Sequence, residues 1–84
     1  MDDAKFLEEY NRIRNEISEL KKTIARARQN WALELKELSQ RPDYEQIKDE
    51  KLQKISDKYA MLFYKHNNKL AGLLALEAQL LEQK

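Results

Sequence analysis

The chain has 84 residues, of which 37% are charged and 42% hydrophobic, with one glycine, one proline, no cysteine and a formal net charge of +1. So few turn-forming residues exclude a sandwich, a barrel or an α/β domain with many connections. The lack of cysteine excludes a disulfide framework, a cysteine-ligated metal site and a thiol nucleophile.

The first predicted element is a helix over about residues 2–39. Its apolar side chains recur at alternating steps of four and three, the heptad spacing typical of helices that pack side by side. Asp2 or Asp3 is suited to cap its N-terminus. After Trp31 the stripe continues in a shifted register. The stripe consists of Phe6, Tyr10, Ile13, Ile17, Leu20, Ile24, Ala27, Trp31, Leu35 and Leu38.

A break is predicted at about residues 40–42. Proline is tolerated at the first position of a helix, and Pro42 pushes Arg41 away from helical backbone angles. Asp43 and Glu45 then place negative charge in the first turn of the next helix. One helix therefore ends here and another begins, and the alternative is a single helix kinked at Pro42.

The second predicted helix covers about residues 43–83 and repeats the apolar spacing. Two helices of nearly equal length with a short connection predict an all-α fold, an antiparallel helical hairpin with coiled-coil packing. The hairpin is expected to form one unit over residues 1–84, within a dimer or a larger bundle. The second stripe consists of Leu52, Ile55, Tyr59, Leu62, His66, Leu70, Leu73, Leu76 and Leu80.

The same pattern predicts which residues oppose each other across the hairpin. Opposing residues should have position numbers with a constant sum, and a sum of 82 or 83 brings most apolar residues of the two stripes together. This register places Trp31 opposite Leu52 and His66 opposite Ile17. Trp31 is then expected to be a structural anchor on the seam between the helices.

The C-terminal part of the second helix is apolar over more than one stripe. Helical angles place several of its leucines on one flank of the seam, and the predicted register puts Leu7 beside Leu74. Contiguous exposed apolar surface usually marks an interface, and two-helix units rarely bury enough to be stable alone. Apolar helix ends that simply fray are the alternative. The predicted partner-binding residues are Leu7, Phe63, Leu70, Leu74 and Leu81.

The charges predict a second candidate surface. Residues 12–28 carry a surplus of four positive charges, and residues 54–70, predicted to lie opposite, carry a surplus of three. A basic middle of this kind suits nucleic acid or an acidic protein, although lysines flanking a seam often only cover it with their stems. The candidate contacts are Arg14, Lys21, Arg26, Arg28, Lys58 and Lys65.

No residue pattern points to catalysis. His66 is the single histidine, and without a second histidine or a cysteine it makes a poor metal site. The stripes are almost wholly apolar, and the sequence has no glycine-rich loop to hold phosphate. We therefore expect no enzymatic activity, no cofactor and no metal.

The expected function is that of a non-catalytic protein–protein interaction module: a small adaptor, a complex subunit or a chaperone-like protein. It would dock its extra apolar flank on a partner helix or on a second copy of itself. A helical nucleic-acid-binding, nucleoid or regulatory protein is the alternative. No run approaches the about 18 apolar residues of a membrane span, and the acidic N-terminus lacks an apolar core. A soluble, cytoplasmic protein is therefore expected.

Overall fold

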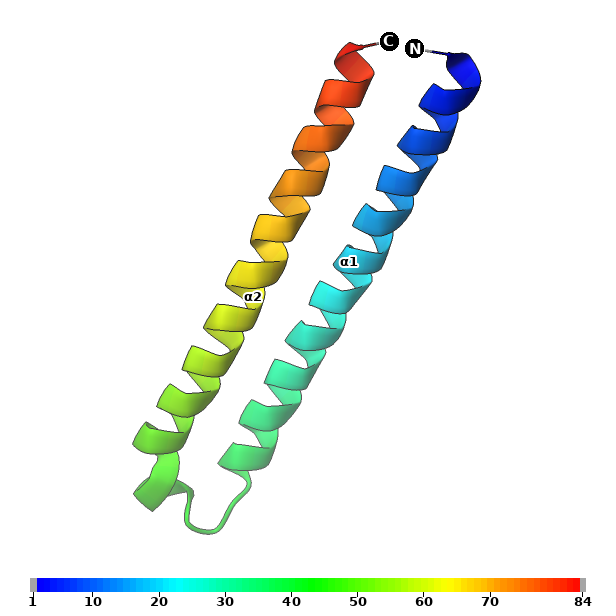
Figure 1. The fold of residues 1–84 in the computed structure, drawn as a ribbon. Coiled ribbons are helices and arrows are strands. Elements are labelled where there is room, and N and C mark those ends of the chain that lie inside the picture. The colour runs from blue at the N-terminus through cyan, green and yellow to red at the C-terminus, as the bar shows by residue number, and fades with distance from the viewer. Residues whose placement is uncertain (1, 84) are drawn as a thin grey trace.

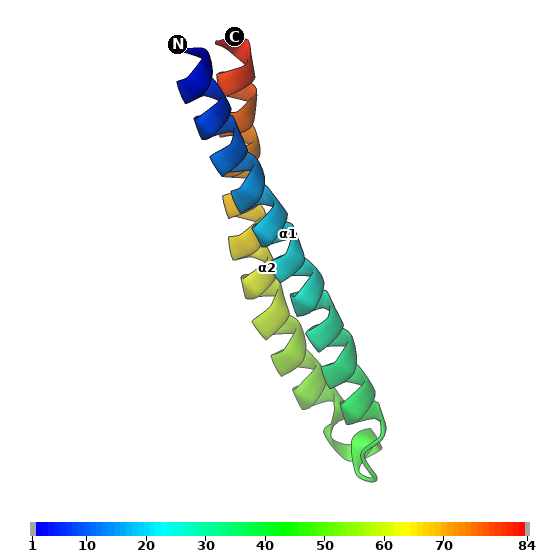
Figure 2. The same ribbon diagram turned by 90° about the vertical axis from the view of Figure 1, so that its right-hand side faces the viewer.

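The computed structural model describes residues 2–83, so residues 1 and 84 of the predicted unit lie outside the described part. It contains two helices, α1 (Asp3–Ser39) and α2 (Tyr44–Glu82). They run antiparallel and side by side (Figures 1 and 2), which confirms the predicted hairpin and excludes the kinked single helix. The molecule measures 63 × 15 × 11 Å, so it is only two helices wide.

The helix ends follow from local hydrogen bonding. Asp2 caps α1, because its carboxylate accepts a hydrogen bond of 3.4 Å from the backbone N–H of Ala4. At the other end of α1, the Ser39 hydroxyl donates to the Lys36 carbonyl at 2.7 Å. The backbone N–H of Gln40 also donates to that carbonyl, which ends the helix with its carbonyls satisfied.

The turn comprises residues 40–43, one residue more than predicted. Pro42 lies before α2 rather than in its first turn, and Asp43 occupies the position preceding the helix. The Asp43 side chain makes no capping hydrogen bond but pairs with Arg41 at 3.2 Å. The backbone N–H of Tyr44 donates to the Arg41 carbonyl, which closes the turn.

The core is the seam between the helices and is one side chain deep. α1 contributes most of it, as its regular heptad stripe predicts. Trp31 departs from the prediction, because it lies at the margin of the seam with 40% of its surface exposed. The buried residues are Phe6, Ile13, Ile17, Leu20, Ile24, Ala27 and Leu38 of α1 and Tyr59, Leu73 and Leu80 of α2.

The seam of α2 drifts towards its C-terminus. Leu76, predicted in the seam, is 48% exposed, and the side chain of Glu77 takes the inward position with 18% exposed. A straight α-helix rotates slowly relative to a strict seven-residue repeat. After several turns, the position that faces the seam has therefore shifted by one residue, here from Leu76 to Glu77. The neighbouring leucine is thereby left on the surface.

The predicted register is wrong by one heptad. Trp31 contacts Tyr59, seven residues beyond its predicted partner Leu52, with ring centroids 6.3 Å apart. Arg14 likewise reaches Glu77 rather than the region of residue 69. A slide by seven residues keeps every heptad position on the seam, so apolar spacing alone does not distinguish the two registers. Figure 1 shows the first turn of α2 extending past the end of α1, which accommodates the slide.

Candidate partner-binding surface

The hairpin has two long faces, one on each side of the seam. Residues seven apart lie on the same face of a helix, so the contact between Arg14 and Glu77 assigns whole stripes of α1 and α2 to one side. We call this side the flank face, and the other the opposite face. The flank face consists of Leu7, Arg14, Lys21 and Arg28 of α1 and Phe63, Leu70, Leu74, Glu77 and Leu81 of α2.

Among the residues that the structure describes, one ion pair crosses the seam on the flank face. The Arg14 guanidinium donates to the Glu77 carboxylate at 2.9 Å, and this bond raises the pKa of Arg14. The Glu77 side chain is mostly buried, so the cation compensates a carboxylate that has lost much of its water. The sequence-based prediction missed the pair because its register placed Arg14 one heptad away from Glu77.

The next two cations of this stripe lie beside apolar side chains. By heptad periodicity from Arg14 and Glu77, Lys21 lies at the level of Leu70 and Arg28 at the level of Phe63. The ring contact of Phe63 with a tryptophan of α1 agrees with this ladder. Within residues 2–83, neither Lys21 nor Arg28 forms an ion pair with a carboxylate.

The five predicted partner-binding residues divide into two groups. Leu7, Leu74 and Leu81 are exposed, with 42% of Leu74 accessible. Phe63 and Leu70 are half-buried and pack against the core cluster of the seam. The observed register moves Leu7 away from Leu74 and towards Leu81, so the exposed leucines lie towards the open end of the hairpin and Phe63 and Leu70 nearer the turn.

Three aromatic rings join the seam to the flank face. Trp31 meets Phe63 edge-on with ring centroids 6.0 Å apart, and both rings contact Tyr59. Trp31 thus bridges α1 and α2, although much of the indole remains accessible. This arrangement places the single tryptophan next to the flank face, where its fluorescence can report on neighbouring residues.

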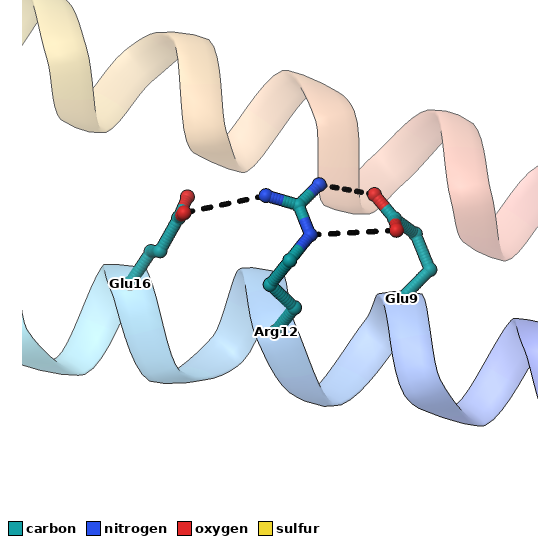
Figure 3. A network of polar contacts seen from close by, with 3 residues as sticks. All are labelled: Glu9, Arg12 and Glu16. Atoms are coloured by element: carbon teal, nitrogen blue, oxygen red, sulfur yellow. Dashed lines mark hydrogen bonds and ion pairs between the residues drawn. The ribbon is translucent and has the colours of Figure 1, made fainter.

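The opposite face is occupied by ion pairs. Arg12 lies between Glu9 and Glu16 along α1 and bonds to both (Figure 3). The bond lowers the pKa of Glu9 and raises that of Arg12. Across the seam on this side, the Lys58 ammonium donates to Glu34 at 3.0 Å. Two cations on this face, Arg12 and Lys58, are therefore compensated within the chain, whereas Arg26 and Lys65 form no ion pair within residues 2–83.

The predicted basic middle does not form a single patch. Of the six candidates, Arg14 and Lys58 bond to carboxylates, and Arg26 and Lys65 lie on the opposite face from Lys21 and Arg28. The observed register also brings Glu77 opposite residues 12–28 and moves Lys58 away from them. In this register residues 12–28 lie opposite residues 63–79, and the surplus across the middle is five charges rather than seven.

The remaining polar features are shallow. His66 is half-buried and borders two open hollows on the opposite face, shared with Thr23, Lys69 and other polar side chains. In the described part of the chain, no three or more metal-ligating side chains cluster, and no helix is long and apolar enough to cross a membrane. A Cβ added at Gly72 would meet no atom within 4 Å, so no second segment of this hairpin crosses there.

Comparison with protein-family models, with curated proteins and with solved structures finds no match for this chain.

Proposed function

We propose that this chain is a non-catalytic protein–protein interaction module, a small adaptor or complex subunit that docks its flank face on a helix. The observation that carries the proposal is the exposure of Leu7, Leu74 and Leu81 on the face that also carries the half-buried Phe63 and Leu70. Apolar side chains grouped in this way on one side of a narrow hairpin are typical of a binding surface.

The energetics of the hairpin support a docking role. Two packed helices share one seam, and such small units rarely bury enough apolar surface to be stable alone. Covering a half-exposed leucine such as Leu74 or Leu81 contributes about 1 kcal/mol. A helix laid on the flank face would gain this burial several times over and convert one seam into a three-helix core.

The contrast between the two faces supports the choice of surface. The opposite face carries Arg12 and Lys58 in ion pairs, and a partner placed there would have to remove water from these charges. The flank face presents apolar side chains whose removal from water is favourable. Docking on the flank face therefore gains apolar burial, and its cost falls on Lys21 and Arg28, which form no ion pair within residues 2–83.

The test compares Leu74→Glu with Met61→Glu. Both introduce a carboxylate at an exposed apolar position of α2, but Met61 points away from the seam, outside the flank face, and is 76% exposed. A photo-crosslinking amino acid at each position, incorporated in cells that make the protein, reports which face is covered. We expect a discrete cross-linked species from position 74 and none from position 61.

Light scattering and circular dichroism of the purified variants complete the experiment. We expect Leu74→Glu to retain the helical content of the wild type by circular dichroism. By light scattering, it should no longer associate with the partner that cross-links at position 74. Met61→Glu should retain both. Equal loss of association in the two variants, or a folded wild type with no cross-link at position 74, would rule out the flank face as the docking surface.

A further inference from the structure

We propose that the occupant of the flank face is a helix of another protein whose apolar stripe is bordered by carboxylates. This inference rests on the proposed function. It specifies the charge of the partner helix and the residues of this chain, Lys21 and Arg28, that its carboxylates would contact. It is carried by Lys21 and Arg28, which lie beside apolar side chains of α2 and form no ion pair within residues 2–83.

The flank face has almost no acid of its own. Between residues 7–35 of α1 and 56–81 of α2, the heptad positions beside the seam on this side include one carboxylate, Glu77, and the stripe bordering them on α2 adds Asp57, which accepts a hydrogen bond from Gln53. Arg14 already bonds to the Glu77 carboxylate at 2.9 Å. Lys21 and Arg28, the next two cations of the same stripe, have no such carboxylate. A partner that covers them must supply carboxylates to offset the free-energy cost of removing their water.

This charge excess argues against a second copy as the occupant. A symmetric dimer formed through the flank face would bring Lys21 and Arg28 of both copies into one interface, with no free carboxylate on either side. Like charges placed together in an interface are unfavourable, whereas a complementary partner is attracted to them. A helix with acidic borders is thus favoured over self-association.

The spacing of the surface fits a helix. Lys21 and Arg28 are seven residues apart, about 10.5 Å along α1, so carboxylates seven residues apart on one helix can meet both. Leu74 and Leu81 repeat the same interval on α2 and suit the apolar stripe of that helix. The α1 stripe bordering this face has small side chains, which allow close approach. They are Asn11, Ser18, Ala25 and Ala32.

The inference is tested with two synthetic 28-residue peptides. Both peptides carry leucine at the two apolar positions of each heptad. The two positions that flank this apolar stripe in each heptad are glutamate in one peptide and lysine in the other. Binding to the full chain is measured by calorimetry and by the fluorescence of Trp31. We expect the glutamate peptide to bind at least tenfold more tightly than the lysine peptide, and less tightly as salt rises.

Matched variants separate local charge from net charge. Lys21→Glu with Arg28→Glu and Arg26→Glu with Lys65→Glu change the net charge equally, but only the first pair lies on the flank face. We expect the first double variant to lose at least tenfold in affinity for the glutamate peptide and the second to lose less than threefold. Equal losses, or equal binding of the two peptides, overturn the inference.

Two further outcomes would also overturn it. A wild-type dimer that Leu74→Glu dissolves would identify a second copy as the occupant. A short DNA duplex that displaces the glutamate peptide and depends on Lys21 and Arg28 would assign these cations to nucleic acid. The dimer result would contradict this inference but not the proposed function. The absence of a cross-link at position 74 would contradict both the proposed function and this inference.

Discussion

Individual side chains in this hairpin have very unequal weight, because a seam one side chain deep has few fully covered positions. Ile17 is the most completely buried, with 1% of its surface exposed, and it lies in the middle of α1. Large apolar residues such as Leu33, by contrast, are more than half exposed. Stability should therefore depend on a short list of residues that all point into the seam.

Replacing Ile17 by alanine tests this directly. The change removes buried methyl groups and leaves a cavity between the helices, so we expect a loss of about 2–4 kcal/mol in the free energy of unfolding. Leu33→Ala, on the exposed surface, should change it by less than about 0.5 kcal/mol. Urea unfolding followed by circular dichroism measures both, and comparable losses would show that the seam is not the core.

Glu34 gives the hairpin a pH dependence. Hydrogen bonding from the Tyr59 hydroxyl, followed by the bond from Lys58, lowers the pKa of Glu34 below its ordinary 4.5. A carboxylate with a lowered pKa in the folded state contributes stability above its unfolded pKa, and the contribution is lost as the pH falls through the folded value.

We therefore expect the Glu34→Gln variant to lose less melting temperature than the wild type when the pH is lowered from 6 to 3. Glu37→Gln is a suitable control, because Glu37 is exposed and forms no ion pair within residues 2–83. Thermal melts at several pH values provide the comparison. Identical pH profiles for the wild type and Glu34→Gln would show that this bond does not contribute to folding.

At the scale of the helices, the register is the feature that spacing alone could not supply. Trp31 lies against Tyr59 and Phe63, whereas the sum of position numbers placed it against Leu52. The tryptophan is the only one in the chain, so its emission reports this arrangement without interference from another indole.

We expect Phe63→Ala to shift the Trp31 emission to longer wavelength and to increase its quenching by iodide, because an edge-on ring contact is lost. Leu52→Ala should leave both properties unchanged. The reverse pattern would restore the register predicted from the sequence.

The two helices, their turn and the α1 seam could be predicted because each rests on local information. Heptad spacing, Asp2 as a cap and Pro42 as a break all act within a few residues. The exposure of Leu76 and the inward turn of Glu77 depend on the accumulated rotation of α2 against a strict heptad. Their prediction needs the partner helix as well as the sequence.

For the candidate surface, too, the sequence predicts what depends on one helix but not what depends on how the two helices align. Leu74 and Leu81 could be placed on one flank from helical angles alone, whereas Leu7 was placed beside Leu74 by a register that is one heptad off. The bond of Arg14 to Glu77 and the lack of ion pairs at Lys21 and Arg28 could not, because they depend on which heptad of α1 meets which heptad of α2.

At the scale of the whole molecule, the shape is a rod with a Cα radius of gyration of 19.0 Å and a length of 63 Å. A helix docked on the flank face would lie along this rod. We expect small-angle scattering of the complex with the glutamate peptide to show a larger cross-section and an unchanged maximum dimension. A marked increase in length would mean that the peptide binds at an end of the hairpin.

The slide by seven residues that leaves the apolar seam intact also has a consequence for how the chain folds. A hairpin closed one heptad short would keep its leucines and isoleucines in contact, but it would set Glu77 against Leu7 and Arg14 against Leu70. The inward carboxylate would then lose its cation, which is costly for a group with little access to water. Apolar burial drives the two helices to close, and we expect the bond between Arg14 and Glu77 to favour the native closure over its nearest competitor.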